Sequence, residues 1–333
     1  MIYADQRWIG NHGIGRFARH VLADLDYQPV PLNSNPAAPL DSWVLARALR
    51  ELERTDVFFS PGYNTPLFCP SAFVFTIHDL NHVFCRETRR PLIQLYYATA
   101  MKRACRRAAN ILTVSEFTRN QIISWSGVSA EKVVSVGNGV DSAFRPEGDS
   151  YGLAFPYLLS VSNRKPHKNE FRIVEAFAKA DLDPDIHLVF TGFPTANLAR
   201  WIEAQGVRPR VEFLGGVDED KLPNLYRGAE ALIFPSLYEG FGLPIVEAMA
   251  CGTPVLTSNI TAMPETAGGA ALLVDPRDVE QIARGTEQIV SLSDLRQDLR
   301  TEGLKRAAQF SWVRTSRRAH EVIAASVRFC TDG

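Results

Sequence analysis

The sequence predicts an α/β protein with two successive parallel β-sheets. Short apolar runs alternate with longer segments of helical period along nearly the whole chain, and this alternation is typical of parallel strands connected by helices. It stops at residues 140–152, where the composition becomes polar and rich in turn formers, and then starts again. We therefore predict two Rossmann-like domains that face each other across a cleft, with a linker between them.

The elements of the first domain, residues 1–150, follow from these runs. Apolar runs predict strands at 57–60, 73–77, 111–114 and 133–136. Apolar residues at helical spacing predict helices at 14–25, 43–53 and 91–108.

The second domain, residues 151–312, repeats the alternation. Its predicted strands lie at 157–161, 187–190, 211–214, 231–234, 255–258 and 271–274. Its predicted helices lie at 170–180, 196–205, 221–228, 244–251, 279–292 and 294–309. The remaining segment, residues 313–333, comes after this domain is complete, and we expect it to form a helix that packs back onto the first domain.

Composition and charge exclude several classes of protein. With 36 basic and 37 acidic residues the net charge is −1, so no overall electrostatic attraction to nucleic acid or to a membrane is expected. The first residues become polar at once, and no apolar run reaches the ~20 residues that a membrane-spanning helix needs. Scattered cysteines without a C-x-x-C pair indicate reduced thiols in a cytoplasmic protein. These are Cys69, Cys85, Cys105, Cys251 and Cys330.

The most informative stretch is SLYEGFGLPIVEAMACGTPV, residues 236–255. It follows the predicted strand 231–234, so its loop leaves a strand end, where open α/β sheets bind ligands. Gly240 and Gly242 leave the backbone N–H groups unobstructed, and Pro244 suits the first position of the following helix. A helix N-terminus behind a glycine-containing loop binds anions, and a diphosphate fits this description.

Two glutamates flank this expected anion site. We place Glu247 in the first turn of the apolar helix, where it either compensates the helix dipole or, being nearly buried, accepts hydrogen bonds from two ribose hydroxyls. A carboxylate at Glu239 is repelled by a diphosphate, so we expect it to bond sugar hydroxyls beyond it. This reasoning favours a nucleotide-sugar site over a surface loop.

The segment YEGFGLPIVEAMACGTPV closely resembles the E-x7-E motif of retaining glycosyltransferases of family four, which have the two-domain GT-B fold. Similar segments are TIHDL at 76–80, TVSEFTRNQI at 113–122, GNGVD at 137–141, GGVDEDKLPNLYRGAEALIFPS before the motif and SNITAMPETAGGAALLVDP after it. The combination is specific, whereas each piece alone is weak. The resemblance implies transfer of a hexose from a nucleotide diphosphate sugar with retention, the second domain binding the donor and the first the acceptor.

The resemblance also implies roles for individual residues of the motif. Glu247 holds the ribose, and Glu239 contacts hydroxyls of the donor sugar. Backbone amides that help to hold the diphosphate and the sugar are those of Phe241, Gly242 and Leu243, behind Gly240.

A basic loop, SVSNRKPHKN, follows the predicted strand 157–161. Arg164 and Lys168 match the family's basic pair, which neutralises the diphosphate as it leaves. No nucleophile stands out, so the resemblance implies a front-face substitution in which the departing diphosphate oxygen helps to remove the acceptor's proton. We expect backbone groups near residues 215–217, including Val217, to contact the base.

Two sites of the first domain match the family less specifically. In NHGIGR, Gly13 and Gly15 precede a helix and are expected to let backbone approach the donor phosphate and the acceptor. Arg16 is either a phosphate ligand or a first-turn helix residue. His78 follows the predicted strand 73–77 and resembles the histidine that points at the sugar; the alternative is a histidine satisfied within its own loop.

Metal-binding patterns in the sequence are weak. His78 and His82 have an H-x3-H spacing, but neither a helix nor a third ligand supports zinc. D-x-D triplets begin at residues 24, 181, 183 and 218, and none lies in a glycine-rich loop at a strand end. We therefore expect no metal and no cofactor other than the donor itself.

Residues 86–107, RETRRPLIQLYYATAMKRACRR, contain seven basic residues and one acidic residue. This segment either docks an anionic membrane or a lipid diphosphate acceptor, or it is a solvated helix face with a packed apolar side.

The motif set looks most like that of bacterial mannosyltransferases of surface-polysaccharide assembly. GDP-mannose is therefore the first expected donor, and a saccharide or a polyprenyl-diphosphate-linked glycan is the expected acceptor. A rhamnosyl or UDP-hexose transferase, or a nucleotide-sugar-binding or epimerase protein of the same architecture, is the alternative. A dinucleotide-dependent oxidoreductase is disfavoured, because no G-x-G-x-x-G follows the first predicted strand.

Overall fold

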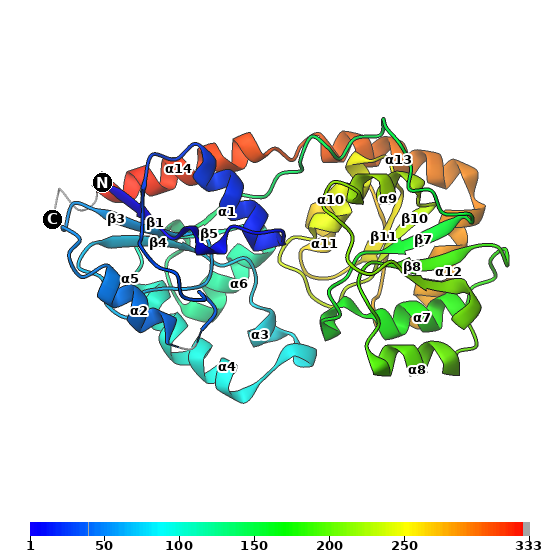
Figure 1. Cartoon of the computed structure of the whole chain (residues 1–333), viewed down its shortest axis with the longest axis horizontal. Coiled ribbons are helices and arrows are strands. Elements are labelled where there is room, and N and C mark those ends of the chain that lie inside the picture. Colours follow the sequence, from blue (N-terminus) through cyan, green and yellow to red (C-terminus); the bar gives the residue numbers. More distant parts are fainter. Residues whose placement is uncertain (39, 329–333) are drawn as a thin grey trace. The chain divides into compact units, whose positions relative to one another are not determined.

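The structure, a computed structural model, describes residues 1–38 and 40–328, which form two compact units (Figure 1). The first unit contains residues 1–139 and the chain from 311 onward, and the second contains residues 140–310. The division at residue 139 comes before the boundary that we place after residue 150 from the sequence. Each unit has one six-stranded sheet whose neighbouring strands are all parallel.

The sheet of the first unit has the strand order β2-β1-β3-β4-β5-β6. Its strands are β1 (Ile2–Ala4), β2 (Gln28–Pro29), β3 (Val57–Ser60), β4 (Ala72–Thr76), β5 (Asn110–Thr113) and β6 (Val133–Ser135). The sequence predicts the last four to within two residues at either end. β1 has only three residues and β2 only two, too few to give a recognisable apolar run, so the sequence does not predict them.

The helices of the first unit surround this sheet. They are α1 (Gly13–Ala23), α2 (Asp41–Ala48), α3 (Asn81–Phe84), α4 (Pro91–Tyr96), α5 (Lys102–Arg107), α6 (Glu116–Ser126) and α14 (Trp312–Arg328). A π-helical segment, Tyr97–Met101, joins α4 to α5, so the helix predicted at 91–108 forms but contains one wider turn.

Helix α14 closes the first unit by covering the end of α1 (Figure 1). The Ser316 hydroxyl donates to the carbonyl oxygen of His20 at 2.9 Å, and the His320 ring donates from Nε2 to the carbonyl of Val21 at 2.7 Å. The Trp312 ring stacks on His20 with 4.4 Å between ring centroids. The last carbonyls of a helix have no partner within it, so α14 satisfies two of them. Phe329 and the last four residues, Cys330 among them, lie outside the described residues.

The sheet of the second unit has the strand order β12-β11-β10-β7-β8-β9. Its strands are β7 (Tyr157–Ser160), β8 (His187–Phe190), β9 (Val211–Phe213), β10 (Ala231–Phe234), β11 (Val255–Ser258) and β12 (Leu272–Val274). The predicted bounds of β8, β10 and β11 are confirmed. These three strands are rich in leucine, β-branched and aromatic residues, and all of their residues except His187 are buried, as expected for the centre of a covered parallel sheet.

Helices cover both faces of this second sheet (Figure 1). They are α7 (Glu170–Lys179), α8 (Ala196–Ala204), α9 (Leu222–Gly228), α10 (Leu243–Ala250), α11 (Met263–Ala267), α12 (Val279–Ser291) and α13 (Ser293–Ala307). α7 packs against α8 and α12, and α10 packs against α9 and α13. The short α11 was not predicted.

The strand order places the site. After β7 the chain builds β8 and β9 outward on one side, then returns to place β10 on the other side of β7. The loops after β7 and β10 therefore leave the same edge of the sheet at the topological switch point, where open α/β sheets bind ligands.

Candidate functional site

An ion pair joins the two loops at the switch point of the second unit. The Lys168 ammonium, in the loop after β7, lies 2.6 Å from a carboxylate oxygen of Glu239, in the loop after β10. Both side chains are largely buried, with exposed fractions of 12% and 15%. The N–H of Leu237 also donates to the carbonyl of His167 at 2.7 Å. Two residues that the sequence assigns to different parts of the donor are thus partners of each other.

Glu239 is held in its ionised form. Burial raises the pKa of its carboxyl group, but the charges of Lys168 and His167 together with hydrogen bonds outweigh this, and the net pKa is lowered. The Lys168 ammonium also lies 4.9 Å from the centroid of the Phe234 ring, a cation–π distance. The pair is therefore ordered against the end of β10.

Arg164 has a different carboxylate partner from Lys168. Its guanidinium donates to the Glu170 carboxylate and to the carbonyl of Thr191, and it lies 5.3 Å from the ring centroids of both Phe190 and Phe213. Burial lowers the pKa of Arg164 and raises that of Glu170, so desolvation of this pair outweighs its mutual attraction. The sequence grouped Arg164 with Lys168, and the structure gives each cation its own acid.

Glu170 is a site residue that sequence reasoning missed. It is the first residue of α7 and is buried, and the charges of both Arg164 and Lys168 lower its pKa against the larger effect of burial. The available signal was a carboxylate at the start of a helix directly after the basic loop.

Helix α10 begins at Leu243, one residue earlier than predicted. Pro244 is therefore its second residue, which also needs no intrahelical partner. Gly242 caps the helix in the left-handed region with φ 94°, a conformation that favours glycine. Phe241 is buried and packs edge-to-face on Phe310 at 5.5 Å, and its carbonyl accepts from the Thr266 hydroxyl at 2.5 Å. The loop before α10 is thus fixed on both sides.

Glu247 lies in the second turn of α10, not in the first, so compensation of the helix dipole does not explain it. It is 1% exposed, and one carboxylate oxygen accepts from the phenol of Tyr226 at 2.8 Å. Tyr226 belongs to α9 and is itself fully buried. Sequence reasoning missed this protein partner, because α9 and α10 meet only in the folded unit.

Three non-glycine residues adopt positive φ among the described residues: Arg164 (61°), Asn169 (64°) and Thr261 (59°). All three lie in loops at the carboxyl edge of the second sheet. The Asn169 amide donates to the carbonyls of Pro235 and Pro276 at 2.9 and 2.6 Å, and Thr261 Oγ1 accepts from the N–H of Glu239 at 3.3 Å. Such strained conformations cluster at functional sites, and here they hold the loops around Glu239.

An exposed aromatic ring lies beside the segment that we expect to contact the base. Phe193, in the loop after β8, is 73% exposed. A side chain at Gly215 would come within 2.9 Å of this ring, and the N–H of Gly192 donates to the carbonyl of Gly215 at 2.6 Å. Val217 follows two residues later and is half-buried. The ring therefore lies against bare backbone and leaves much of its surface to solvent, an arrangement suited to stacking.

In the first unit, His78 is buried and partnered within its own sheet edge. Its Nε2–H donates to the carbonyl of Pro61 at 2.8 Å, and its ring packs edge-to-face on Phe17 and Tyr63. Burial lowers the pKa of His78 to about 4, so the ring is neutral at pH 7 and Nδ1 carries a lone pair. His82 contacts a different group, the carbonyl of Thr88. Among the described residues, no three His, Cys, Asp or Glu side chains form a metal-binding group.

Local packing explains the glycines of the segment NHGIGR. Gly13 begins α1, and a side chain at Gly15 would lie 2.3 Å from the carbonyl oxygen of Gly10. The His12 ring caps the helix by accepting from the N–H of Gly15 at 3.0 Å. Close approach of the Gly10 backbone therefore accounts for Gly15 without a ligand.

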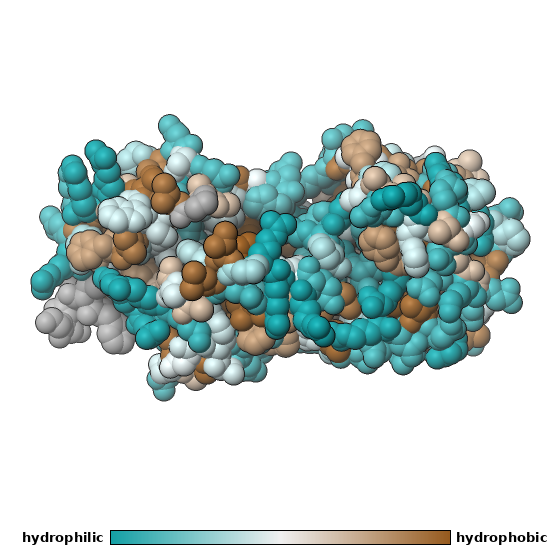
Figure 2. Space-filling model, turned by 90° about the horizontal axis from the view of Figure 1, so that it is seen from below, coloured by the Kyte–Doolittle hydropathy of each residue, from teal (hydrophilic) through white to brown (hydrophobic). Residues whose placement is uncertain are grey.

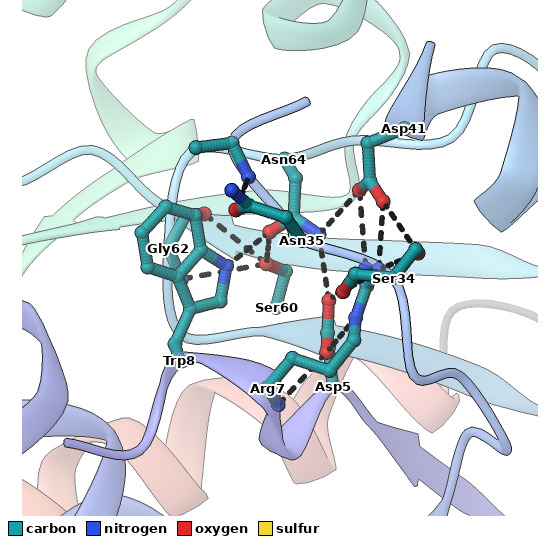
Figure 3. Close-up of polar contacts among 10 residues, drawn as sticks. Asp5, Arg7, Trp8, Ser34, Asn35, Asp41, Ser60, Gly62 and Asn64 are labelled. Carbon is teal, nitrogen blue, oxygen red and sulfur yellow. Dashed lines mark hydrogen bonds and ion pairs between the residues drawn. The ribbon is translucent and has the colours of Figure 1, made fainter. Parts of the chain in front are cut away.

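A buried polar cluster at the ends of β1 and β3 was also missed (Figure 3). Arg7 donates to Asp5 at 2.7 Å and to Asp41 at 2.7 Å, and the Asn64 amide donates to both carboxylates. The Trp8 indole donates to Asn64. Burial alone lowers the pKa of Arg7, but its bonds to the two carboxylates outweigh this effect, so the net pKa is raised. Two carboxylates face one guanidinium, so the cluster carries a net negative charge. Its satisfied hydrogen bonds hold together three loops, which contain Arg7, Ser34 and Asn64.

No helix within residues 1–38 and 40–328 is both long and apolar enough to span a membrane. The cysteines among these residues, Cys69, Cys85, Cys105 and Cys251, are free and buried.

Comparisons with known proteins agree with this architecture. The O-antigen chain mannosyltransferase B of Escherichia coli is 32% identical over 281 residues, which cover 80% of this chain and 73% of that protein. The crystal structure of WaaG, a glycosyltransferase involved in lipopolysaccharide biosynthesis, aligns with a TM-score of 0.77 at 16% identity, covering 97% of this chain and 99% of the other. Anabaena Alr3699/HepE in complex with UDP-glucose aligns with a TM-score of 0.76 at 17% identity, covering 97% and 99%.

Two family descriptions match successive parts of the chain. Residues 9–144 match Glycosyltransferase Family 4, and residues 153–306 match Glycosyl transferases group 1. The two parallel sheets, the switch-point loops and the relative from Escherichia coli agree with both matches. The chain therefore belongs to the family 4, group 1 glycosyltransferases and has their GT-B fold.

Proposed function

We propose that this glycosyltransferase transfers mannose from GDP-mannose, with retention, to a saccharide or polyprenyl-diphosphate-linked glycan in surface-polysaccharide assembly at the cytoplasmic face of the membrane. The observation that carries the proposal is the buried Lys168–Glu239 pair at the switch point, three residues before the cap of α10. The mannosyltransferase relative supports the sugar. UDP-glucose in the Anabaena structure supports a nucleotide-sugar donor of another kind, and a UDP-hexose or rhamnosyl transferase is the alternative.

In this proposal the donor diphosphate takes the place of Glu239 on Lys168. The Lys168 ammonium and the N-terminus of α10 then stabilise the same anion. Glu239, released from its partner, accepts hydrogen bonds from hydroxyls of the donor sugar. Lys168 and the N-terminus of α10 already lie at the site before the donor binds. Once the diphosphate has replaced Glu239 on Lys168, both groups are in place when charge develops on the leaving group.

The nucleoside has two further contacts in this proposal. Glu247, oriented by Tyr226, accepts from a ribose hydroxyl with the remaining capacity of its carboxylate. The base stacks on Phe193 beside residues 215–217, where aromatic stacking supplies affinity for any base. Neither contact selects guanine over uracil, so the choice of GDP rests on the mannosyltransferase relative from Escherichia coli.

Arg164, whose partner in the structure is Glu170, is the second cation in this proposal. Its guanidinium is desolvated beside Glu170 and the rings of Phe190 and Phe213, and it supplies the diphosphate with a second cation. Bond changes are those of a simple substitution. The C1–O bond to the diphosphate breaks, the acceptor oxygen bonds to C1 on the same face, and the acceptor proton goes to the departing diphosphate oxygen.

One experiment tests the proposal directly. The protein is incubated with GDP-mannose, UDP-glucose or a dTDP-sugar, with and without an acceptor glycan, and the released nucleotide diphosphate is measured. The anomeric coupling of the product, read by NMR, reports retention. Release of GDP, but of no other nucleotide diphosphate, in the presence of the acceptor supports the proposal. Interconversion of nucleotide sugars without release indicates an epimerase.

A further inference from the structure

A polar cavity lies in the second unit, at the edge of its sheet opposite to the loops that carry Lys168 and Glu239. Its volume is about 650 Å³, within the range of pockets that bind small molecules. Its walls include Glu230 and Pro254, the residues directly before β10 and β11. Neighbouring strands of this sheet are all parallel, so their first residues share one edge and the loops after β7 and β10 leave the other. The cavity is therefore separate from the Lys168–Glu239 pair.

Helix α10 spans the distance between these two places. It begins at Leu243, beside the loop of Glu239, and ends at Ala250. The next two residues, Cys251 and Gly252, line the cavity. A helix of this length rises roughly 12 Å, at about 1.5 Å per residue, so one small anion cannot contact both the cavity and the N-terminus of α10.

Three arginines line the cavity: Arg227, Arg296 and Arg300. Arg296 forms an ion pair with Glu230 at 2.9 Å. Arg227 donates from three of its five N–H groups to neutral acceptors, two backbone carbonyls and the Asn224 amide oxygen, at 2.5 to 3.2 Å. In the part of the chain that the structure describes, neither Arg227 nor Arg300 forms an ion pair. Two positive charges at the cavity therefore lack a carboxylate partner.

Glycines leave both of these guanidinium groups accessible. A side chain at Gly148 would come within 3.1 Å of Arg227, and one at Gly252 within 3.3 Å of Arg300. Arg227 is half-buried and Arg300 is exposed. Because bare backbone lies beside each guanidinium, a ligand in the cavity can reach the N–H groups that the protein does not use.

The N-terminus of α13 adds to the positive potential of the cavity. Its first residues, Ser293 and Asp294, belong to the walls, and no side chain caps the helix. Asp294 offsets part of the helix dipole. Across the walls, three arginines outnumber the two acids, Glu230 and Asp294. The cavity therefore favours an anion.

The other lining residues indicate which kind of anion fits. None of the described residues that line the cavity is aromatic, and the uncharged ones are small or polar, among them Ser150, Ser293 and Gln297. The walls thus offer no ring on which a nucleobase could stack and no apolar surface for a lipid chain. Guanidinium groups bind phosphate through paired hydrogen bonds, and hydroxyl and amide groups suit the hydroxyls of a sugar.

The face of the second unit that carries α7 and α8 differs from this cavity. Figure 2 shows that hydrophilic side chains cover most of it and that the apolar ones are scattered, as is ordinary on the surface of a folded domain. Helices α9 and α13 lie on the other side of the sheet (Figure 1). The side with α9 and α13, not this face, therefore carries the candidate site.

We propose that the cavity binds a phosphorylated sugar. The phosphate would accept hydrogen bonds from Arg227 and Arg300 near the N-terminus of α13, and the sugar hydroxyls would bond to Ser150 and Gln297. This is a second site, distinct from the one proposed for the donor, and it stands whichever sugar nucleotide is the donor.

Calorimetry on the whole protein tests the proposal. Mannose 6-phosphate, glucose 6-phosphate, mannose and inorganic phosphate are titrated separately at about 0.1 M salt. We expect at least one of the two sugar phosphates to bind, inorganic phosphate to bind roughly tenfold more weakly, and mannose to give no signal. No binding of either sugar phosphate at about 10 mM, or equally tight binding of inorganic phosphate, would overturn the proposal.

Variants of the cavity sharpen this test. Arg300→Glu should weaken binding of the sugar phosphate at least about tenfold, because it replaces a charge-assisted hydrogen bond by repulsion. Arg227→Gln should also weaken binding, and Arg227→Lys should restore part of it. The matched control is Arg284→Glu, an equal change of charge at an exposed position of α12, which should bind like the wild type. Unchanged affinity of both Arg300→Glu and Arg227→Gln would refute the site.

Two further measurements separate the cavity from the donor site. Lys168→Ala removes the cation of the donor site and should bind the sugar phosphate like the wild type; loss of binding would place the ligand in the donor site instead. Arg300→Glu should release nucleotide diphosphate at the wild-type rate when no sugar phosphate is present, and a large fall would contradict a separate site. Thermal melting, which exposed substitutions should shift by only a few degrees, confirms that each variant is folded.

Discussion

Lys168 and Glu239 are 71 residues apart in the sequence and 2.6 Å apart in the structure. They belong to the two loops that diverge from neighbouring strands β7 and β10, so the topology of the sheet itself brings a cation and an anion to one place. The pair gives the site opposite charges for the two parts of a sugar diphosphate before any donor is bound.

Removing this pair should impair transfer. Lys168→Ala takes away a preorganised cation at the leaving group, and we expect kcat to fall roughly 10²- to 10³-fold, as measured by nucleotide diphosphate release. The matched control is Lys179→Ala, which breaks an ion pair of the same length with Glu280 at an exposed position and should leave kcat unchanged. Near-normal turnover of Lys168→Ala would remove Lys168 from the proposed machinery.

Tyr226→Phe should destabilise the protein and weaken nucleotide binding. The substitution leaves the buried Glu247 carboxylate with one donor fewer, at a cost of about 1–3 kcal/mol in the free energy of unfolding. Urea unfolding measures this cost. Tyr157→Phe, which removes a hydrogen bond to the Leu225 carbonyl at 2.7 Å, is the control without a carboxylate and should cost less.

The ribose contact has its own readout. Wild-type protein should bind a nucleoside diphosphate more tightly than its 2′,3′-dideoxy analogue, because Glu247 accepts from ribose hydroxyls. Glu247→Gln should reduce this difference, as seen by calorimetry. Equal discrimination by both proteins would show that another group contacts the ribose.

Phe193→Ala should lower affinity for the nucleoside diphosphate roughly tenfold, since base stacking on an aromatic ring contributes about 1–3 kcal/mol. Phe193→Trp should retain the affinity. The control is Phe171→Ala, another exposed phenylalanine of the second unit, which we expect to bind normally. Affinity that is unaffected by Phe193→Ala would place the base elsewhere.

His78 should make the protein sensitive to mild acid. The unfolded imidazole takes up a proton near pH 6.5, whereas the folded one has a pKa of about 4. The unfolded chain therefore binds more protons between these values, so the free energy of unfolding falls as the pH drops from 6.5 towards 4, by up to about 3 kcal/mol. His78→Gln, whose amide can still donate to Pro61, should show a shallower fall in urea titrations at pH 7, 6 and 5.

Chelation should not reduce turnover. Lys168, Arg164 and the N-terminus of α10 are proposed to neutralise the diphosphate, so release of nucleotide diphosphate should be the same with EDTA as with added Mg²⁺ or Mn²⁺. Activity that is lost with EDTA and restored by one of these ions would require a metal at the diphosphate.

Much of the second sheet could be predicted because its strands are short, apolar and bounded by turn residues. β10 and β11 were predicted to the residue, and the helix after β10 to one residue at either end. β1, with only three residues, has no pattern to detect. The π-helical turn at Tyr97–Met101 could not be predicted, because a π-helical segment has the same local composition as an α-helix.

The site was predictable as a set of loops, but not as a set of contacts. Sequence position placed Arg164, Lys168 and Glu239 at strand ends, yet which acid each cation meets depends on how the loops fold back. Arg164 forms its ion pair with Glu170, six residues later in the sequence, and Lys168 forms its ion pair with Glu239. Phe193 and Tyr226 were missed for a related reason: an aromatic residue in a loop or on a helix gives no sign of whether it is exposed or which group it bonds.

The position of α14 has a consequence for synthesis of the chain. The second unit is continuous in sequence, whereas the first needs residues 312–328 to satisfy the carbonyls of His20 and Val21. During translation the domain begun first is therefore completed last, after the second has emerged and can fold as a unit. Until then the end of α1 and the side of β3, β4 and β5 that α14 contacts remain uncovered, so the nascent first domain exposes this surface for longer than the second domain exposes its own.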